Sequence, residues 1–173
     1  MVGAGPLRPL ALAIASLDLL AAWAIVMAIS GMVALVALQV LLRYAFNTSL
    51  GWTDETSRLA FVWSIFLGIP LGIRRGSHIG IEFLTARLPA VPQDLLARTM
   101  AFLGAALMAL VAWQSVRIAM EQWDELMGTL DLSAGWFMLA VAWGAGHSML
   151  HLMWITVAGP HRGRALTDEG GLA

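Results

Sequence analysis

A short charged cluster at the start of one apolar run is the first feature that could do chemistry. In "WTDETSRLAFVW", residues 52–63, Asp54 and Glu55 shortly precede Arg58. Positions three and four apart are neighbours on a helix, so these side chains can reach one another. Thr53 is suited to cap that helix, and acidic residues are favoured in a first helical turn. The cluster therefore predicts a capped helix start with a local ion pair.

Two histidines are the other candidates, and they lie one helical turn apart. His147 and His151 fall inside a long apolar stretch, whereas His78 and His161 fall in connecting segments. A four-helix redox subunit would hold haem between histidines on opposite helices. Neighbours on one helix cannot flank the same iron, so we expect this pair to bond with polar groups of the bundle. A haem-carrying four-helix redox membrane subunit remains the alternative function.

Other enzymatic chemistry has few residues to support it. The sequence holds no cysteine, which excludes thiolate nucleophiles, thiolate metal sites and disulfides. It shows no nucleophile paired with a base, no metal cluster and no phosphate-binding loop. The sequence therefore predicts a protein that is not an enzyme and has no cofactor and no metal site.

The elements that must position these residues are apolar helices. Of 173 residues, 60% are hydrophobic and 12% are charged, a composition typical of an integral membrane protein. A helix that crosses a bilayer needs about 20 apolar residues. Four stretches approach this length. The sequence thus predicts a single all-α membrane domain over 1–173, with four transmembrane helices at about 18–42, 56–73, 97–118 and 133–158.

The first span begins near Asp18, which we expect at the membrane edge. The residues Ala13, Ile14 and Ala15 would suit cleavage of a signal peptide. However, the apolar stretch before them is short and a much longer one follows, so we expect the first span to stay in the protein.

Arginine placement predicts how the four spans are oriented. Cytoplasmic loops of membrane proteins are enriched in basic residues. If the N-terminus is cytoplasmic, the outside segments hold only Arg43, Arg58 and Arg117, and the inside segments hold Arg8, Arg74, Arg75, Arg87, Arg98, Arg162 and Arg164. Both termini are therefore predicted to be cytoplasmic.

The connection between the second and third spans mixes apolar and charged residues. This pattern predicts a short amphipathic helix in the membrane interface, at about 78–88. We expect it to be anchored on the cytoplasmic side by Arg74, Arg75, His78 and Glu82. A C-terminal tail is predicted over 160–173.

The spans themselves predict support and not a transport path. Their apolar runs carry no Asp, Glu or Arg near the centre, whereas an anion path needs cationic or broken-helix groups near the midplane. A small proton-coupled multidrug exporter would also need an intramembrane carboxylate. Small residues at every fourth position instead predict close helix packing, in Ala97, Ala101, Ala105 and Ala109 and in Ala140, Gly144 and Ser148.

One stretch, "QVLLRYAFNTSLGWTDETSRLAFVWSIFLGIPLGIRRGSHIGIEFL" at 39–84, resembles the small, Q-type membrane subunit of tripartite ATP-independent periplasmic (TRAP) transporters. The order and spacing of several residues carry the resemblance: Gln39, Arg43, Tyr44, Phe46, Asn47, Trp52, Glu55, Arg58, Arg75, His78, Ile79 and Glu82. The "AGWF" at 134–137 is similar to the family too. His147 and His151 are not features of the family.

The resemblance implies a subunit of a bacterial inner-membrane transporter. In this family a large membrane subunit carries sodium and substrate, a periplasmic binding protein delivers a carboxylate-type or sialic-acid-like substrate, and the small subunit braces the large one. We therefore expect a subunit-interface or structural role for Gln39, Arg43, Trp52, Glu55, Arg58 and Trp63. The acidic residues Glu121, Asp124 and Glu125 are candidates for docking the binding protein, because complementary charge speeds encounter.

Overall fold

The computed structural model describes residues 8–48, 50–74 and 90–159. This part of the chain folds into four helices, α1 (Arg8–Ala45), α2 (Trp52–Arg74), α4 (Ala90–Glu121) and α5 (Gly135–Ala158). The prediction of an all-α protein is confirmed. The predicted amphipathic segment at about 78–88 and the tail at 160–173 lie outside the described residues.

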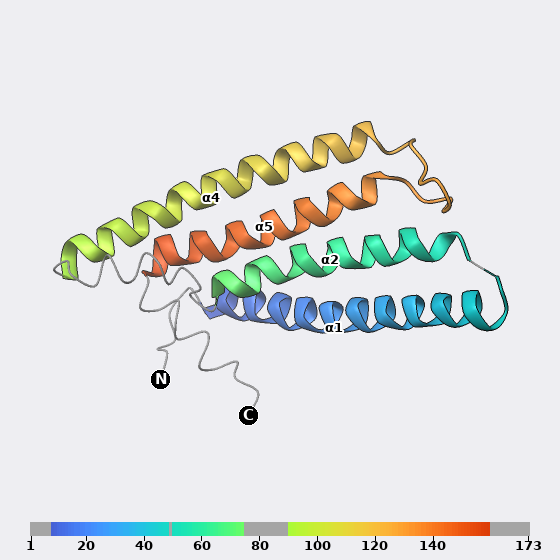
Figure 1. The fold of residues 1–173 in the computed structure, drawn as a ribbon. Helices are drawn as coiled ribbons and strands as arrows, with labels where there is room; N and C mark the ends of the chain where they lie inside the picture. The colour runs from blue at the N-terminus through green and yellow to red at the C-terminus, as the bar shows by residue number, and fades with distance from the viewer. Residues whose placement is uncertain (1–7, 49, 75–89, 160–173) are drawn as a thin grey trace, which may run out of the picture.

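The four helices lie side by side in the order α1, α2, α5, α4 (Figure 1). The main helix contacts are those of α1 with α2, of α2 with α5 and of α4 with α5. The chain reverses between α1 and α2 and again between α4 and α5, and both turns lie at the same end of the row (Figure 1). We call this the loop end. The last of the four described helices thus occupies an inner place in the row.

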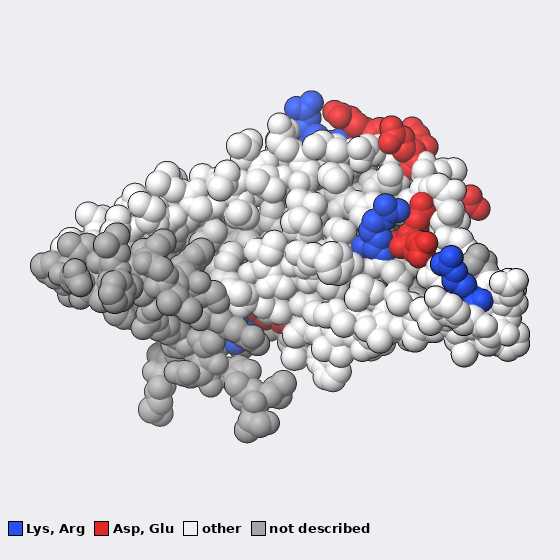
Figure 2. Space-filling view, viewed as in Figure 1, with Lys and Arg blue, Asp and Glu red and all other residues white. Residues whose placement is uncertain are grey.

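Within the described part of the chain, three helices are long and apolar enough to cross a membrane: Ala11–Ala45, Trp52–Arg74 and Pro92–Glu121. Helix α5 has 24 residues, a length that also suits a crossing, but His147 and His151 lower its apolar character. Most charged side chains on the visible face gather toward the loop end, and a smaller red and blue patch lies below the middle, beside the grey atoms (Figure 2). The wide uncharged surface between them suits a hydrocarbon layer.

The helices extend beyond the predicted spans. Helix α1 has 38 residues and so measures about 57 Å at about 1.5 Å per residue, more than a hydrocarbon core of about 30 Å needs. It begins ten residues before the predicted span, so Asp18 lies inside the helix and not at its end. Helix α2 starts at Trp52, four residues before the predicted span.

Small residues let α5 approach both of its neighbours. A Cβ atom on Gly144 would lie 2.5 Å from the carbonyl oxygen of Phe66 in α2, so only glycine fits there. On the α4 side, Ala101 and Ala105 are buried together with Leu152 of α5. Close backbone approach gives packing contacts where lipid removes the hydrophobic drive. The small-residue positions at 101, 105 and 144 are therefore at helix contacts, as the sequence predicts.

Candidate functional site

Asp18 is the most unusual residue of the described chain, because it is a buried acid on an apolar helix. Its exposed fraction is 2%, and it shares one buried face of α1 with Ile14 and Ala21. Burial of a carboxylate is costly unless partners compensate it. The structure places Asp18 ten residues inside α1, buried against neighbouring helices. Its predicted place at the membrane edge stays a prediction.

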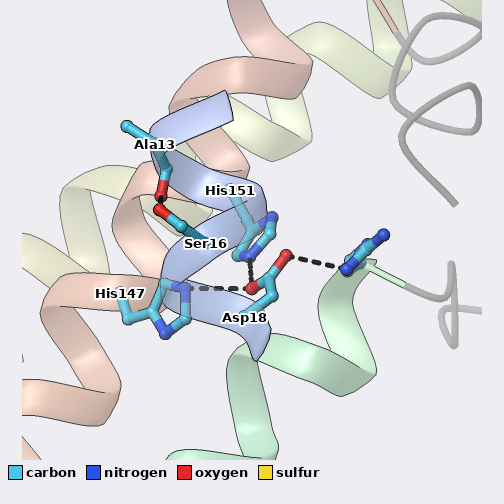
Figure 3. A network of polar contacts seen from close by, with 6 residues as sticks. Ala13, Ser16, Asp18, His147 and His151 are labelled. Carbon is cyan, nitrogen blue, oxygen red and sulfur yellow. Dashed lines mark hydrogen bonds and ion pairs between the residues drawn. The ribbon is translucent and has the colours of Figure 1, made fainter. Parts of the chain in front are cut away.

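Three side chains from two other helices surround the Asp18 carboxylate (Figure 3). On one oxygen, Oδ1, the Nε2 atom of His151 lies 2.8 Å away and the Nε2 atom of His147 lies 3.0 Å away. On the other oxygen, Oδ2, the Nη1 atom of Arg74 donates a hydrogen bond of 3.1 Å. Helices α1, α2 and α5 thus meet at one polar cluster, which we call the Asp18 cluster.

The two histidines of the Asp18 cluster are not equivalent. His151 is aligned for a hydrogen bond with Asp18. His147 is close to the same oxygen, yet neither of its ring nitrogens makes an aligned hydrogen bond within the described chain. A short distance alone does not make a hydrogen bond, because a hydrogen bond weakens steeply when it bends. Within the described residues, His147 is therefore a buried imidazole whose ring nitrogens lack an aligned hydrogen bond.

The donor set of the Asp18 cluster could hold a metal ion. One ligand atom each from Asp18, His147 and His151 lies within 4.8 Å of the other two. The guanidinium of Arg74 opposes a second cation at this place, because its charge has the same sign. The cluster does not suit haem, since both histidines lie on α5 and face the same carboxylate oxygen. The haem-subunit alternative therefore gains no support from this geometry.

Glu55 has partners that its neighbours in the sequence do not reveal. Its carboxylate accepts hydrogen bonds from the backbone N–H of Gly128 at 2.9 Å and of Thr129 at 2.8 Å. The Thr129 hydroxyl donates a third bond of 2.6 Å. Arg58 approaches Glu55 only to 3.8 Å, and its side chain is 64% exposed. Glu55 therefore fastens the start of α2 to the α4–α5 loop.

The other residues assigned to a subunit interface do not form one cluster. Arg43 is exposed and Gln39 half-buried, and no ion pair joins Arg43 to Glu55 among the residues with described positions. Trp52 is 40% exposed. Trp63 lies against Trp136 of α5, with ring centroids 6.5 Å apart. A role of these residues at a subunit interface stays a prediction.

Thr53 does not cap α2 in the predicted way. Its hydroxyl donates a 2.7 Å hydrogen bond to the carbonyl oxygen of Leu50, and its side chain is fully buried. A capping threonine would instead accept a bond from a backbone N–H of the first turn. Thr53 therefore ties the helix start to the residues before it.

The predicted anchor and docking residues are placed in part. Arg74 faces Asp18, whereas Arg75, His78 and Glu82 lie outside the described residues. The candidate docking acids Glu121, Asp124 and Glu125 are all exposed at the loop end. Helix α4 ends at Glu121, three residues beyond the predicted span. Docking by these acids stays a prediction.

The Asp18 cluster is the group that reading the sequence missed. Asp18 and His151 are 133 residues apart, so no local spacing connects them. Two features of the sequence could have predicted the cluster: a pair of histidines one turn apart on one apolar helix, and an acidic residue on another apolar helix. Polar residues within membrane helices usually pair with one another. The predicted bond to a polar group of the bundle is present for His151, whereas His147 approaches the same carboxylate oxygen without an aligned hydrogen bond among the described residues.

A family model matches residues 32–159 of the chain. It describes the tripartite ATP-independent periplasmic transporters, DctQ component. The match covers α2, α4 and α5 completely together with the end of α1. Asp18 lies before the matched region, whereas Arg74, His147 and His151 lie within it.

Several curated proteins are similar to parts of the chain. A putative TRAP transporter small permease protein of Haemophilus influenzae is 40% identical over 62 residues, which cover 36% of this chain and 38% of that protein. The C4-dicarboxylate TRAP transporter small permease protein DctQ of Vibrio cholerae is 35% identical over 51 residues, which cover 30% and 22%. The Haemophilus influenzae sialic acid TRAP transporter permease protein SiaT is 39% identical over 51 residues, which cover 30% and 8%.

Proposed function

Because the chain belongs to the DctQ component family of the tripartite ATP-independent periplasmic transporters, we propose that it is the small permease subunit of such a transporter. The match over residues 32–159 is the observation that carries this proposal. The three curated proteins bear TRAP permease names, two of them as small permease proteins. The stretches they share with the chain span 38% or less of their own lengths.

The small subunit braces a large membrane subunit. The helices form a row and not a closed bundle, so two broad apolar faces remain for lipid and for a protein partner. Helix α1 contributes much of this apolar surface, because Val26, Val33 and Val40 are exposed along its length. The similar stretch makes up only 8% of SiaT, which supports pairing of this unit with a much larger permease region.

All four helices cross the membrane, and both termini are cytoplasmic. Helix α5 is 24 residues long and lies between two helices that are apolar enough to cross. Its histidines are tolerated there because they face Asp18 and not lipid. The arginine distribution supports this orientation. The segment at about 78–88 then lies at the cytoplasmic interface, with Arg75 and Glu82 among its anchors.

The complete transporter imports a carboxylate-type substrate by sodium symport, and a periplasmic binding protein delivers the substrate. The acids Glu121, Asp124 and Glu125 then face the periplasm, where they are exposed at the loop end. Complementary charge between this rim and the binding protein would govern the rate of encounter more than the affinity. The small subunit contributes assembly and docking to import and carries no substrate itself.

The proposed function is tested by assembly and uptake in the native host. A tagged version of the chain is purified in mild detergent, and mass spectrometry identifies what purifies with it. We expect a TRAP large permease subunit in stoichiometric amount, and loss of uptake of a TRAP substrate when the gene is deleted. Recovery of the chain without a large TRAP subunit, together with unchanged uptake after deletion, would contradict the proposal.

The docking role has its own experiment. Glu121→Gln, Asp124→Asn and Glu125→Gln are combined in one variant, and uptake is measured at limiting binding protein over a salt series. We expect slower uptake at low salt and a flatter salt dependence, because steering by charge is screened by salt. Purification with the large subunit should be unchanged. Equal uptake by variant and wild type across the salt series would contradict docking, and these acids would then only keep the loop in water.

A further inference from the structure

We propose that Asp18, His147 and His151 form a binding site for a divalent transition-metal ion of the zinc class. These residues are 2%, 4% and 3% exposed in that order. Two imidazole nitrogens and one carboxylate oxygen are a donor set typical of zinc sites that keep a coordination position open. This inference departs from the expectation, based on the sequence, that the protein has no metal site.

The placement of the donors fits a small ion. Histidines four residues apart on a helix present both imidazoles on one face, which is the spacing of known helical zinc ligands. Both rings point toward the Asp18 carboxylate in Figure 3. Their Nε2 atoms lie 3.0 and 2.8 Å from Oδ1. Donors around a tetrahedral zinc ion are about 3.3 Å apart, so the side chains must separate by about 0.3 to 0.5 Å.

His147 gives independent support for a ligand at this place. It is buried, it is aimed at the same oxygen as His151, and neither ring nitrogen has an aligned hydrogen bond within the described residues. A buried polar atom without a partner is costly. Coordination of a metal ion through Nε2 would use the lone pair of that nitrogen and remove part of this cost.

Arg74 limits how tightly the ion binds. Its guanidinium bonds Oδ2, whereas both histidines approach Oδ1, so one carboxylate oxygen remains available for the metal. The positive charge of Arg74 nevertheless repels a second cation. Removal of this charge should therefore strengthen metal binding. A purely structural ion-pair network predicts no such gain.

The test uses the full chain in lipid nanodiscs, purified with a tag that contains no histidine and stripped with EDTA. Co²⁺ is titrated while visible absorption and calorimetry are recorded. We expect saturable binding of one Co²⁺ per chain with the intense bands of a low-coordination site, and displacement by Zn²⁺. Either ion should raise the thermal midpoint, because a ligand that binds only the folded state stabilises it.

Variants of the proposed ligands test where the ion binds. Asp18→Asn, His147→Gln and His151→Gln should each abolish the Co²⁺ bands, and the matched control Asp124→Asn, an exposed acid, should retain them. Arg74→Gln should bind Co²⁺ about tenfold more tightly or better. Absence of a saturable site in the wild-type chain would overturn the proposal even if the variants fail to fold. Unchanged bands in both histidine variants would overturn it too.

Discussion

Glu55 lies in the first turn of α2, yet its carboxylate is held by backbone groups 73 and 74 residues further along the chain. A carboxylate that accepts several N–H and O–H bonds forms the stronger, charge-assisted kind of hydrogen bond. These bonds fix the α4–α5 loop against α2. The ion pair with Arg58 that the sequence predicts is a minor part of the arrangement, because that guanidinium is mostly exposed.

Glu55→Gln should loosen the α4–α5 loop. The variant keeps one acceptor oxygen but loses the charge, so its bonds to Gly128 and Thr129 weaken. We expect faster hydrogen exchange of these two amides, measured by mass spectrometry in detergent. Asp54→Asn is the matched control, since Asp54 is an exposed neighbouring acid. Equal exchange rates in Glu55→Gln and wild type would show that the carboxylate does not hold the loop.

The histidines also show which contacts could not be predicted from the sequence. The sequence predicts that His147 and His151 bond with polar groups, because neutral imidazoles in an apolar helix need partners. It cannot identify Asp18 as that partner, since the pairing depends on how α1 and α5 meet across the fold. The burial of Asp18 escapes the sequence for the same reason. The transporter family match decides against a multidrug exporter.

Among the elements, α5 makes the closest contacts. Its glycine at 144 lies against the backbone of Phe66, and a Cβ there would be 2.5 Å from the carbonyl oxygen and 2.9 Å from the Phe66 Cβ. Neither atom can move unless the helix axes move. The spacing between α2 and α5 is thus set by the absence of one side chain.

Gly144→Ala should force α2 and α5 apart and destabilise the fold by about 1 to 3 kcal/mol, the usual cost of overpacking. Thermal unfolding in detergent, followed by tryptophan fluorescence, would show this as a lower midpoint. Gly146→Ala is the control, because a Cβ at that position meets no atom within 4 Å. A Gly144→Ala midpoint at or above that of Gly146→Ala would contradict the close packing.

The helices were the most predictable elements. Long apolar stretches bounded by charge leave few alternatives to a helix in lipid, where every backbone group must be bonded internally. The ends were less predictable, since α1 begins ten residues before its predicted span and α4 begins seven residues before its own. Such ends depend on loop contacts, for example the hydrogen bond from Met127 to Leu132, that apolar length does not reveal.

At the scale of the whole molecule, four crossings predict which connections share a side of the membrane. Single cysteines can be placed without background because the sequence has none. Thr48→Cys and Asp131→Cys, both exposed at the loop end, should react with a membrane-impermeant maleimide added to the periplasm. Ser77→Cys should react only from the cytoplasm. A reporter fused to the C-terminus should also be cytoplasmic, and a periplasmic signal from it would mean that α5 does not cross.

The order of helices along the row differs from their order along the chain. Helix α4 is synthesised before α5, yet α5 lies between α2 and α4 in the row. The main helix contact of α4 is with α5, and α5 joins it to α2. During synthesis on the ribosome, α1 and α2 can pair as soon as they emerge, but α4 must wait without its principal neighbour until the last helix is inserted. A nascent chain released before α5 would therefore leave α4 detached in the lipid, exposed to the proteases that remove orphaned membrane segments.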